Sequence, residues 1–153
     1  MRHYPPDSPQ AMARLVVLAL LADGIIETDE MDLLDDGRTV AGLGLDSEGF
    51  DDVFYAFCAD MLRAGQRMTT DPLDLDGDTI DRMLDEVRNP LLRRKTLRAM
   101  MDIVHADGEL AGGEAVLIAR AMRRWGIGLD RFSVATPGAS RLSPRNQQQG
   151  LRA

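Results

Sequence analysis

Residues 22–34 read ADGIIETDEMDLL, and residues 106–118 read ADGELAGGEAVLI. A constant offset between the two stretches pairs like residues: Asp23 with Asp107, Gly24 with Gly108, Ile26 with Leu110, Glu30 with Glu114, Leu33 with Leu117 and Leu34 with Ile118. An internal repeat indicates one structural unit used twice. Each copy is an apolar stretch, a short Asp-Gly turn and a second amphipathic stretch. The sequence therefore predicts two pseudo-symmetric helical hairpins.

The composition is that of one globular domain. The chain has 153 residues, of which 44% are hydrophobic and 28% charged, enough for a single core. Its formal charge of -7 argues against a nucleic-acid partner. The single cysteine, Cys58, excludes an internal disulfide and a zinc site built on several thiolates. We therefore expect a soluble, cytoplasmic domain.

Helical periodicity recurs along the chain, and no long run alternates apolar and polar residues. The sequence predicts an all-α fold, a compact bundle of about six helices. We expect helices at about 9–22, 28–41, 47–61, 79–88 and 90–106, a last helix that includes 117–125, and a loop over 65–78. Asp46-Ser47 and Asn89-Pro90 are typical helix starts. The predicted domain spans residues 9–135, after an N-terminal extension (1–8) and before a disordered tail (136–153).

The first predicted helix is apolar on nearly every side, which places it in the middle of the bundle. Arg14 interrupts its apolar run, and about twelve residues are too few to span a membrane. The sequence therefore predicts no transmembrane segment.

The aspartate of each Asp-Gly turn requires a partner. A glycine after a helix end closes the turn, and a glutamate early in the next helix favours the dipole of that helix. A carboxylate at the end of a helix instead faces the negative end of the dipole. It is therefore stabilised either by the amides that start the next helix or by a cation, and both alternatives stay open.

Duplication of the hairpin suggests how a cation would be held. Packing about a pseudo-twofold axis would bring together four carboxylates: Asp23, Glu30, Asp107 and Glu114. Glu27, Asp29 and Glu109 would form an outer layer. Ligands that are all oxygen favour magnesium, calcium or manganese over zinc.

The pattern Ala-Asp-Gly-x-(Ile/Leu)-x-x-x-Glu resembles the tellurite-resistance TerB family and the TerB-like domain of DnaJ-type co-chaperones. The resemblance covers about residues 9–126. It implies an all-helical bundle with internal pseudo-symmetry, a divalent-metal role for Asp23, Glu30, Asp107 and Glu114, and membership of stress-response systems. The chain departs from the family at Glu27 and Ala111, where a small hydroxylated cap is usual.

Groups suited to catalysis are few. Only His3, in an end expected to be mobile, and His105 carry an imidazole, and Cys58 is expected to be an inert core thiol. No nucleophile elbow, phosphate loop or dinucleotide-binding motif is present. We therefore expect no enzyme activity.

Charge is distributed in blocks along the chain. Asp23 to Glu86 holds 19 acids and 4 arginines, whereas Arg88 to Trp125 holds 8 bases and 4 acids. The basic residues of the two last helices are Arg93, Arg94, Lys95, Arg98, Arg120, Arg123 and Arg124. They form either a solvated surface, with Arg98 paired to Asp102, or a face that docks an acidic protein partner or an anionic membrane surface.

Overall fold

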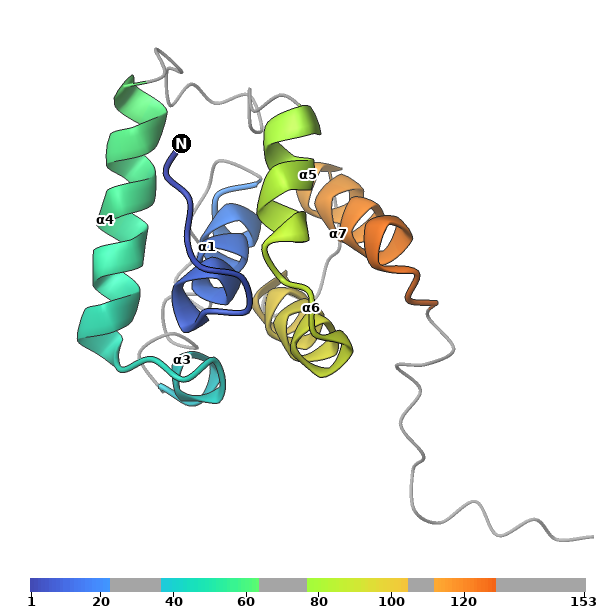
Figure 1. Cartoon of the computed structure of the whole chain (residues 1–153), viewed down its shortest axis with the longest axis horizontal. Helices are drawn as coiled ribbons and strands as arrows, with labels where there is room; N and C mark the ends of the chain where they lie inside the picture. Colours follow the sequence, from blue (N-terminus) through green and yellow to red (C-terminus); the bar gives the residue numbers. More distant parts are fainter. Residues whose placement is uncertain (23–36, 64–76, 105–111, 129–153) are drawn as a thin grey trace, which may run out of the picture.

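A computed structural model describes residues 1–22, 37–63, 77–104 and 112–128 of the chain (Figure 1). The helices of these ranges are α1 (Pro9–Leu20), α3 (Arg38–Gly42), α4 (Ser47–Arg63), α5 (Gly77–Asp85), α6 (Pro90–Val104) and α7 (Gly112–Trp125). The same ranges contain no strand. The predicted all-α fold class is therefore confirmed. The pseudo-symmetry of the two hairpins stays a prediction, because residues 28–36 lie outside the described part of the chain.

Helix α1 lies in the middle of the bundle, as predicted. The Ser8 hydroxyl accepts a hydrogen bond from the Ala11 amide at 3.2 Å, and Pro9 takes the first helical position. Every residue from Ala11 to Leu20 is buried, and the helix contacts α4, α5, α6 and α7. The helix ends at Leu20, two residues before the predicted end at Ala22.

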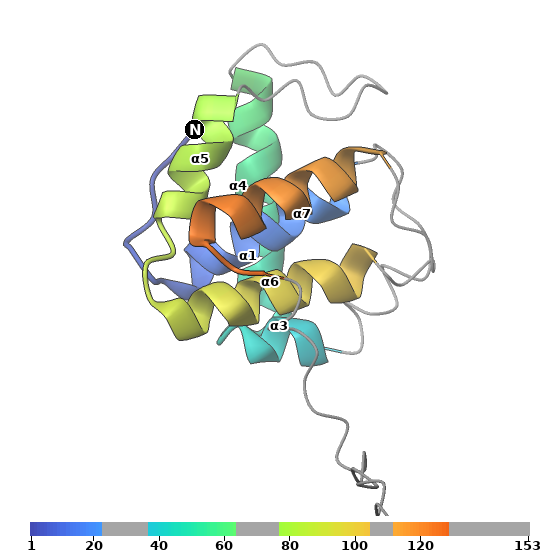
Figure 2. The same ribbon diagram turned by 90° about the vertical axis from the view of Figure 1, so that its right-hand side faces the viewer.

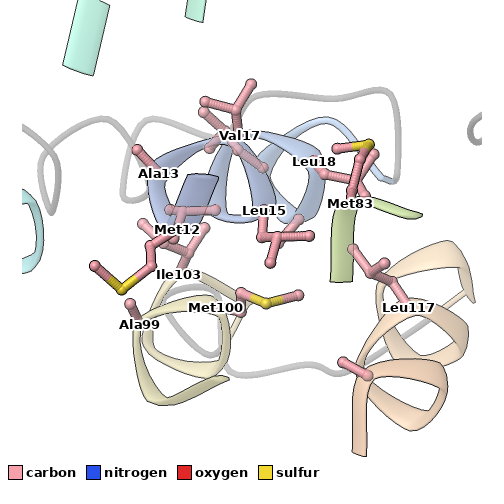
Figure 3. Packing of buried hydrophobic residues seen from close by; sticks show 14 of the residues in the cluster. Met12, Ala13, Leu15, Val17, Leu18, Met83, Ala99, Met100, Ile103 and Leu117 are labelled. Atoms are coloured by element: carbon pink, nitrogen blue, oxygen red, sulfur yellow. The ribbon is translucent and has the colours of Figure 1, made fainter. Parts of the chain in front are cut away.

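The core is built around the contact between α1 and α6. Figure 3 shows Met12 and Leu15 of α1 on the side that faces Met100 and Ile103 of α6, with Leu117 of α7 beside them. Each of these side chains is at most 4% exposed. Burial of one such side chain stabilises the fold by about 1.5–3 kcal/mol. The aliphatic and thioether side chains of α1 and α6 therefore hold the bundle together.

Helix α4 packs on α1 with one face. The Asp46 carboxylate accepts a hydrogen bond from the Gly49 amide at 2.7 Å, which confirms the predicted start of this helix. The buried apolar residues are Phe50, Val53, Phe57 and Met61, at helical spacing. Asp52 lies on the opposite, exposed face. The amphipathic pattern of the sequence therefore decides which side of α4 meets the core.

The starts and ends of the later helices follow local signals. The Asn89 side chain accepts a hydrogen bond from the Leu91 amide at 2.9 Å, and Pro90 begins α6, as predicted. At the end of α7, the Trp125 indole donates to the Leu84 carbonyl at 3.1 Å. That bond ties the last turn of α7 to α5.

The predicted continuous helix over residues 28–41 is wrong at Gly37. This residue has a φ of +68°, in the left-handed region, and α3 begins only after it, at Arg38. Glycine adopts that conformation without the steric cost that other residues incur, and a left-handed residue interrupts a right-handed helix. Val40 is buried as its helical spacing predicts. Helix α5 also begins earlier than predicted, at Gly77 rather than Thr79.

The N-terminal residues 1–8 run between α4 and α5 before α1 begins (Figure 1). The Asp7 carboxylate accepts hydrogen bonds from the amides of Arg88 and Asn89, which lie between α5 and α6. The predicted tail, residues 136–153, lies outside the described residues. No helix in the described ranges has the length and apolar character needed to cross a membrane.

Candidate functional site

The two helices that precede the repeated Asp-Gly turns end on the same side of the molecule. Figure 2 shows the C-terminal ends of α1 and α6, and the first turn of α7, on its right-hand side. Helices α1 and α6 also pack against each other. The ends that lead into residues 23–36 and 105–111 therefore share one end of the bundle.

Of the four predicted metal ligands, only Glu114 belongs to the described residues. It lies in the first turn of α7 and is 2% exposed. The first amides of a helix have no partner within the helix, and the N-terminal end of its dipole favours a negative charge. A buried carboxylate is therefore accommodated at this position. Asp23, Glu30 and Asp107, like Glu27, Asp29 and Glu109, lie outside the described residues.

The shared metal site stays a prediction. Within the four described ranges, no group of three or more His, Cys, Asp or Glu residues is placed to hold a metal ion. A site of four carboxylates would therefore need the residues of both Asp-Gly turns.

A charged cluster of three buried residues and the exposed Arg2, which was not predicted, joins the N-terminal segment to the bundle. We call Arg2, Arg14, Asp60 and Glu86 the N-terminal cluster. Arg14 lies in the middle of α1 and is only 2% exposed. Its guanidinium donates to the Glu86 carboxylate and to the Arg2 carbonyl, and it lies 4.9 Å from the centre of the Tyr4 ring. The sequence feature that points to this cluster is Arg14 itself, a charged residue within an otherwise apolar helix.

The other carboxylates and bases of this region are bound as well. Glu86 also lies within 3.2 Å of the His3 ring nitrogen Nδ1 and accepts from the Tyr4 amide at 3.4 Å. Arg2 donates to both carboxylate oxygens of Asp60, at 2.9 and 3.1 Å, and its amide adds a third bond at 3.0 Å. The Arg2 guanidinium holds the pKa of Asp60 below its usual range. His3, predicted to lie in a mobile end, is largely exposed and contacts Glu86 through Nδ1.

The arginines of α7 are not all free to dock a partner. Arg120 donates to both oxygens of Asp81, at 2.7 and 3.0 Å, and Arg124 donates to both oxygens of Asp85, at 3.0 and 2.7 Å. We call these four residues the α5–α7 cluster. The hydrogen bonds from Arg120 lower the pKa of Asp81. Arg120 and Arg124 therefore bind α5, although Arg124 is also exposed, as Arg123 is.

On α6, the basic residues divide into bound and exposed ones. The Arg93 guanidinium donates to the Val87 carbonyl at 2.7 Å, and Arg98 lies 3.8 Å from Asp102, the predicted pair. Arg94 and Lys95 are exposed, without an ion pair among the described residues. This part of α6 is an exposed basic face.

Cys58 was expected to be a core thiol, but it is not a core residue. It lies on α4 and is only partly buried, because it falls between the buried stripe and the exposed face. Burial raises the pKa of its thiol, which disfavours the reactive thiolate. His105 lies outside the described residues.

Comparison of the chain with protein-family models, with characterised proteins and with solved structures gave no match. The resemblance to the TerB family therefore rests on the repeated motif alone.

Proposed function

We propose that the chain is a non-enzymatic, TerB-like domain of a bacterial stress response that acts in the cytoplasm and binds a divalent cation, a protein partner, or both. The cation proposal is supported by the common position of the ends of α1 and α6 and the start of α7 at one end of the bundle. The ligands would be Asp23, Glu30, Asp107 and Glu114.

The chemistry of these four residues suits a hard cation. Magnesium, calcium and manganese prefer carboxylate oxygens, and water completes their coordination. Glu114 fits such a site, since its buried carboxylate lies in the first turn of α7. A bound cation would neutralise the carboxylates of two turns that are distant in sequence. It would thereby stabilise the folded domain without performing chemistry.

Thermal unfolding with manganese, calcium, magnesium or a chelator tests this proposal. At about one hundred times the dissociation constant, a bound ion stabilises the fold by about 2.7 kcal/mol. In a domain of this size, that corresponds to a rise in melting temperature of roughly 5–10 °C. Calorimetric titration with the same ions gives the stoichiometry, with one ion per chain expected.

Variants identify the ligands. Asp23→Asn and Asp107→Asn should each abolish the stabilisation by the ion. Asp52→Asn, at an exposed carboxylate of α4, makes the same charge change and should leave the stabilisation intact. If the chelator has no effect and all three variants respond alike to the ions, the cation site does not exist.

The second candidate is a protein-interaction scaffold akin to the co-chaperone domain, in which the Asp-Gly turns serve only the structure. The exposed Arg94 and Lys95 favour it, together with Leu91, which is 71% exposed on the same helix. Charged surfaces steer partners of opposite charge. This face would thus bind an acidic protein partner or, peripherally, an anionic membrane.

The double variant Arg94→Gln and Lys95→Gln tests whether this face binds a protein partner or a membrane. Its capture of partners from a bacterial lysate, identified by mass spectrometry, should fall relative to the unchanged protein. Flotation with vesicles that contain phosphatidylserine detects a membrane role, with neutral vesicles as the control. If the variant behaves like the unchanged protein in both assays, the basic face of α6 is only a solvated surface.

A further inference from the structure

A small pocket lies where the N-terminal segment meets α1 and α5. Its volume is about 100 Å³, and its lining includes Arg2, Arg14 and Arg82 from these three parts of the chain. Glu86 is the one carboxylate among the described residues that line it. Asp60 binds the Arg2 guanidinium from outside the lining and Glu86 binds the Arg14 guanidinium, so the excess positive charge of the lining is that of Arg82.

The charge of Glu86 is already compensated by its own contacts. One of its oxygens accepts from the Arg14 guanidinium. The other accepts from the Tyr4 amide and lies 3.2 Å from the His3 ring nitrogen Nδ1. A carboxylate held in this way repels a second anion less than a free carboxylate would. The Arg82 guanidinium donates to the Asp78 carbonyl at 3.2 Å and to the Thr79 hydroxyl at 3.4 Å, both neutral acceptors. Its positive charge is therefore not compensated by an ion pair among the described residues and can attract an anion.

Arg14 supplies an unused donor to this region. Two of its nitrogens donate to the Arg2 carbonyl and to Glu86, but its Nε is buried and has no hydrogen-bond partner among the described residues. A buried donor without an acceptor destabilises the folded protein, because the donor has lost its bond to water. A ligand that brings an acceptor oxygen would remove that cost.

The start of α5 adds to the favourable field for an anion. Thr79 lines the pocket from the first turn of this helix. The first amides of a helix and the positive end of its dipole attract phosphate and similar anions. Two independent features, the arginine lining and the helix start, therefore favour the same kind of ligand.

We propose that this pocket binds a tetrahedral oxyanion, either free phosphate or the phosphoryl group of a small ester. A water molecule occupies about 30 Å³ of liquid volume, so the pocket has room for about three waters. That space fits one phosphate or phosphoryl group. The proposal uses none of the four carboxylates of the cation proposal, and each stands or falls independently.

Calorimetric titration with sodium phosphate, against sodium chloride at equal ionic strength, tests the pocket. We expect saturable binding of one phosphate per chain. Arg82→Gln removes a rim arginine that is exposed, so the fold should persist. It should weaken phosphate binding at least about tenfold, the effect of losing one hydrogen bond to a charged group.

The matched control is Arg94→Gln, which makes the same charge change at an exposed position of α6. It should bind phosphate with unchanged affinity. Absence of saturable binding, or equal loss in the two variants, would overturn the proposal. Titration with phosphoserine shows which source is used, since tighter binding than that of free phosphate assigns the site to the phosphoryl group of an ester.

A nuclear magnetic resonance measurement places the ligand. The Arg14 Nε–H resonance should shift on addition of phosphate, because its missing acceptor is then supplied. In Arg82→Gln, the same shift should require a higher phosphate concentration. If phosphate binds while this resonance stays fixed, the ligand lies elsewhere and the proposed pocket is wrong.

Discussion

The N-terminal cluster and the α5–α7 cluster use the same arginine and carboxylate chemistry in opposite environments. In the first, the Arg14 and Glu86 side chains are 2% and 10% exposed, whereas in the second Arg124 and Asp85 are 43% and 49% exposed. Breaking a buried pair leaves a charge without water or partner, while an exposed pair exchanges its partner for water. Burial, rather than the number of bonds, therefore decides how much each cluster contributes to the stability of the fold.

The largest effect is expected from breaking the buried pair. Arg14→Met leaves the Glu86 carboxylate without its main cationic partner, and the free energy of unfolding should fall by about 3–5 kcal/mol. Urea denaturation followed by circular dichroism measures this loss. The variant keeps most of the side-chain volume, so the loss reports the charge rather than a cavity.

Two further variants sharpen this measurement. Arg14→Met combined with Glu86→Gln removes both charges and should recover a large part of the lost stability. Arg120→Met makes the same substitution in the α5–α7 cluster and should cost less than about 1 kcal/mol. Equal losses for Arg14→Met and Arg120→Met would contradict the comparison.

The N-terminal cluster also shows where prediction from the sequence ends. Starts of helices depend on neighbouring residues, and so the starts at Asp46-Ser47 and Asn89-Pro90 are predicted correctly. Arg14 differs, because its partner Glu86 is 72 residues away. A single arginine in a helix that is apolar on every side predicts that a carboxylate will bind it. The residues near Arg14 in the sequence do not show which carboxylate this is.

The α5–α7 cluster carried a signal that the sequence analysis overlooked. Asp81 and Asp85 are four residues apart on α5, and Arg120 and Arg124 are four apart on α7. Both pairs are separated by 39 residues along the chain. Equal spacing of opposite charges on two helices is a signal that the two helices pack together. The shared metal site of Asp23, Glu30, Asp107 and Glu114 stays a prediction.

A smaller effect is expected at Asp60, the second carboxylate of the N-terminal cluster. Asp60→Asn weakens the bidentate contact with Arg2, and should cost about 1.5 kcal/mol, the lower end of the range for hydrogen bonds to a charged group. Because Arg2 lowers the pKa of Asp60 in the folded protein, this contribution is complete above the ordinary aspartate pKa of about 4. It is lost as the pH falls below that value.

Urea midpoints measured from neutral to acidic pH check the sign. The unchanged protein should lose more stability below about pH 4 than Asp60→Asn does, since the variant has no carboxylate to protonate at this position. Arg2→Gln should give the same reduced dependence on pH. Parallel curves for all three proteins would show that the Arg2–Asp60 contact does not stabilise the fold.

The smallest effect is expected at Asp81, where the comparison is tested by salt. Asp81→Asn should cost less than about 1 kcal/mol at low ionic strength, because Arg120 regains water when it loses its partner. At about 1 M salt the screening length falls to about 3 Å, and the difference between the variant and the unchanged protein should nearly vanish. The loss caused by Arg14→Met should persist at the same ionic strength, since salt screens a buried pair much less. Denaturation at low and high salt thus tests the effect of burial on each contact. A stability loss that does not change with salt for Asp81→Asn, or one that falls with salt for Arg14→Met, would contradict the ranking of the two clusters.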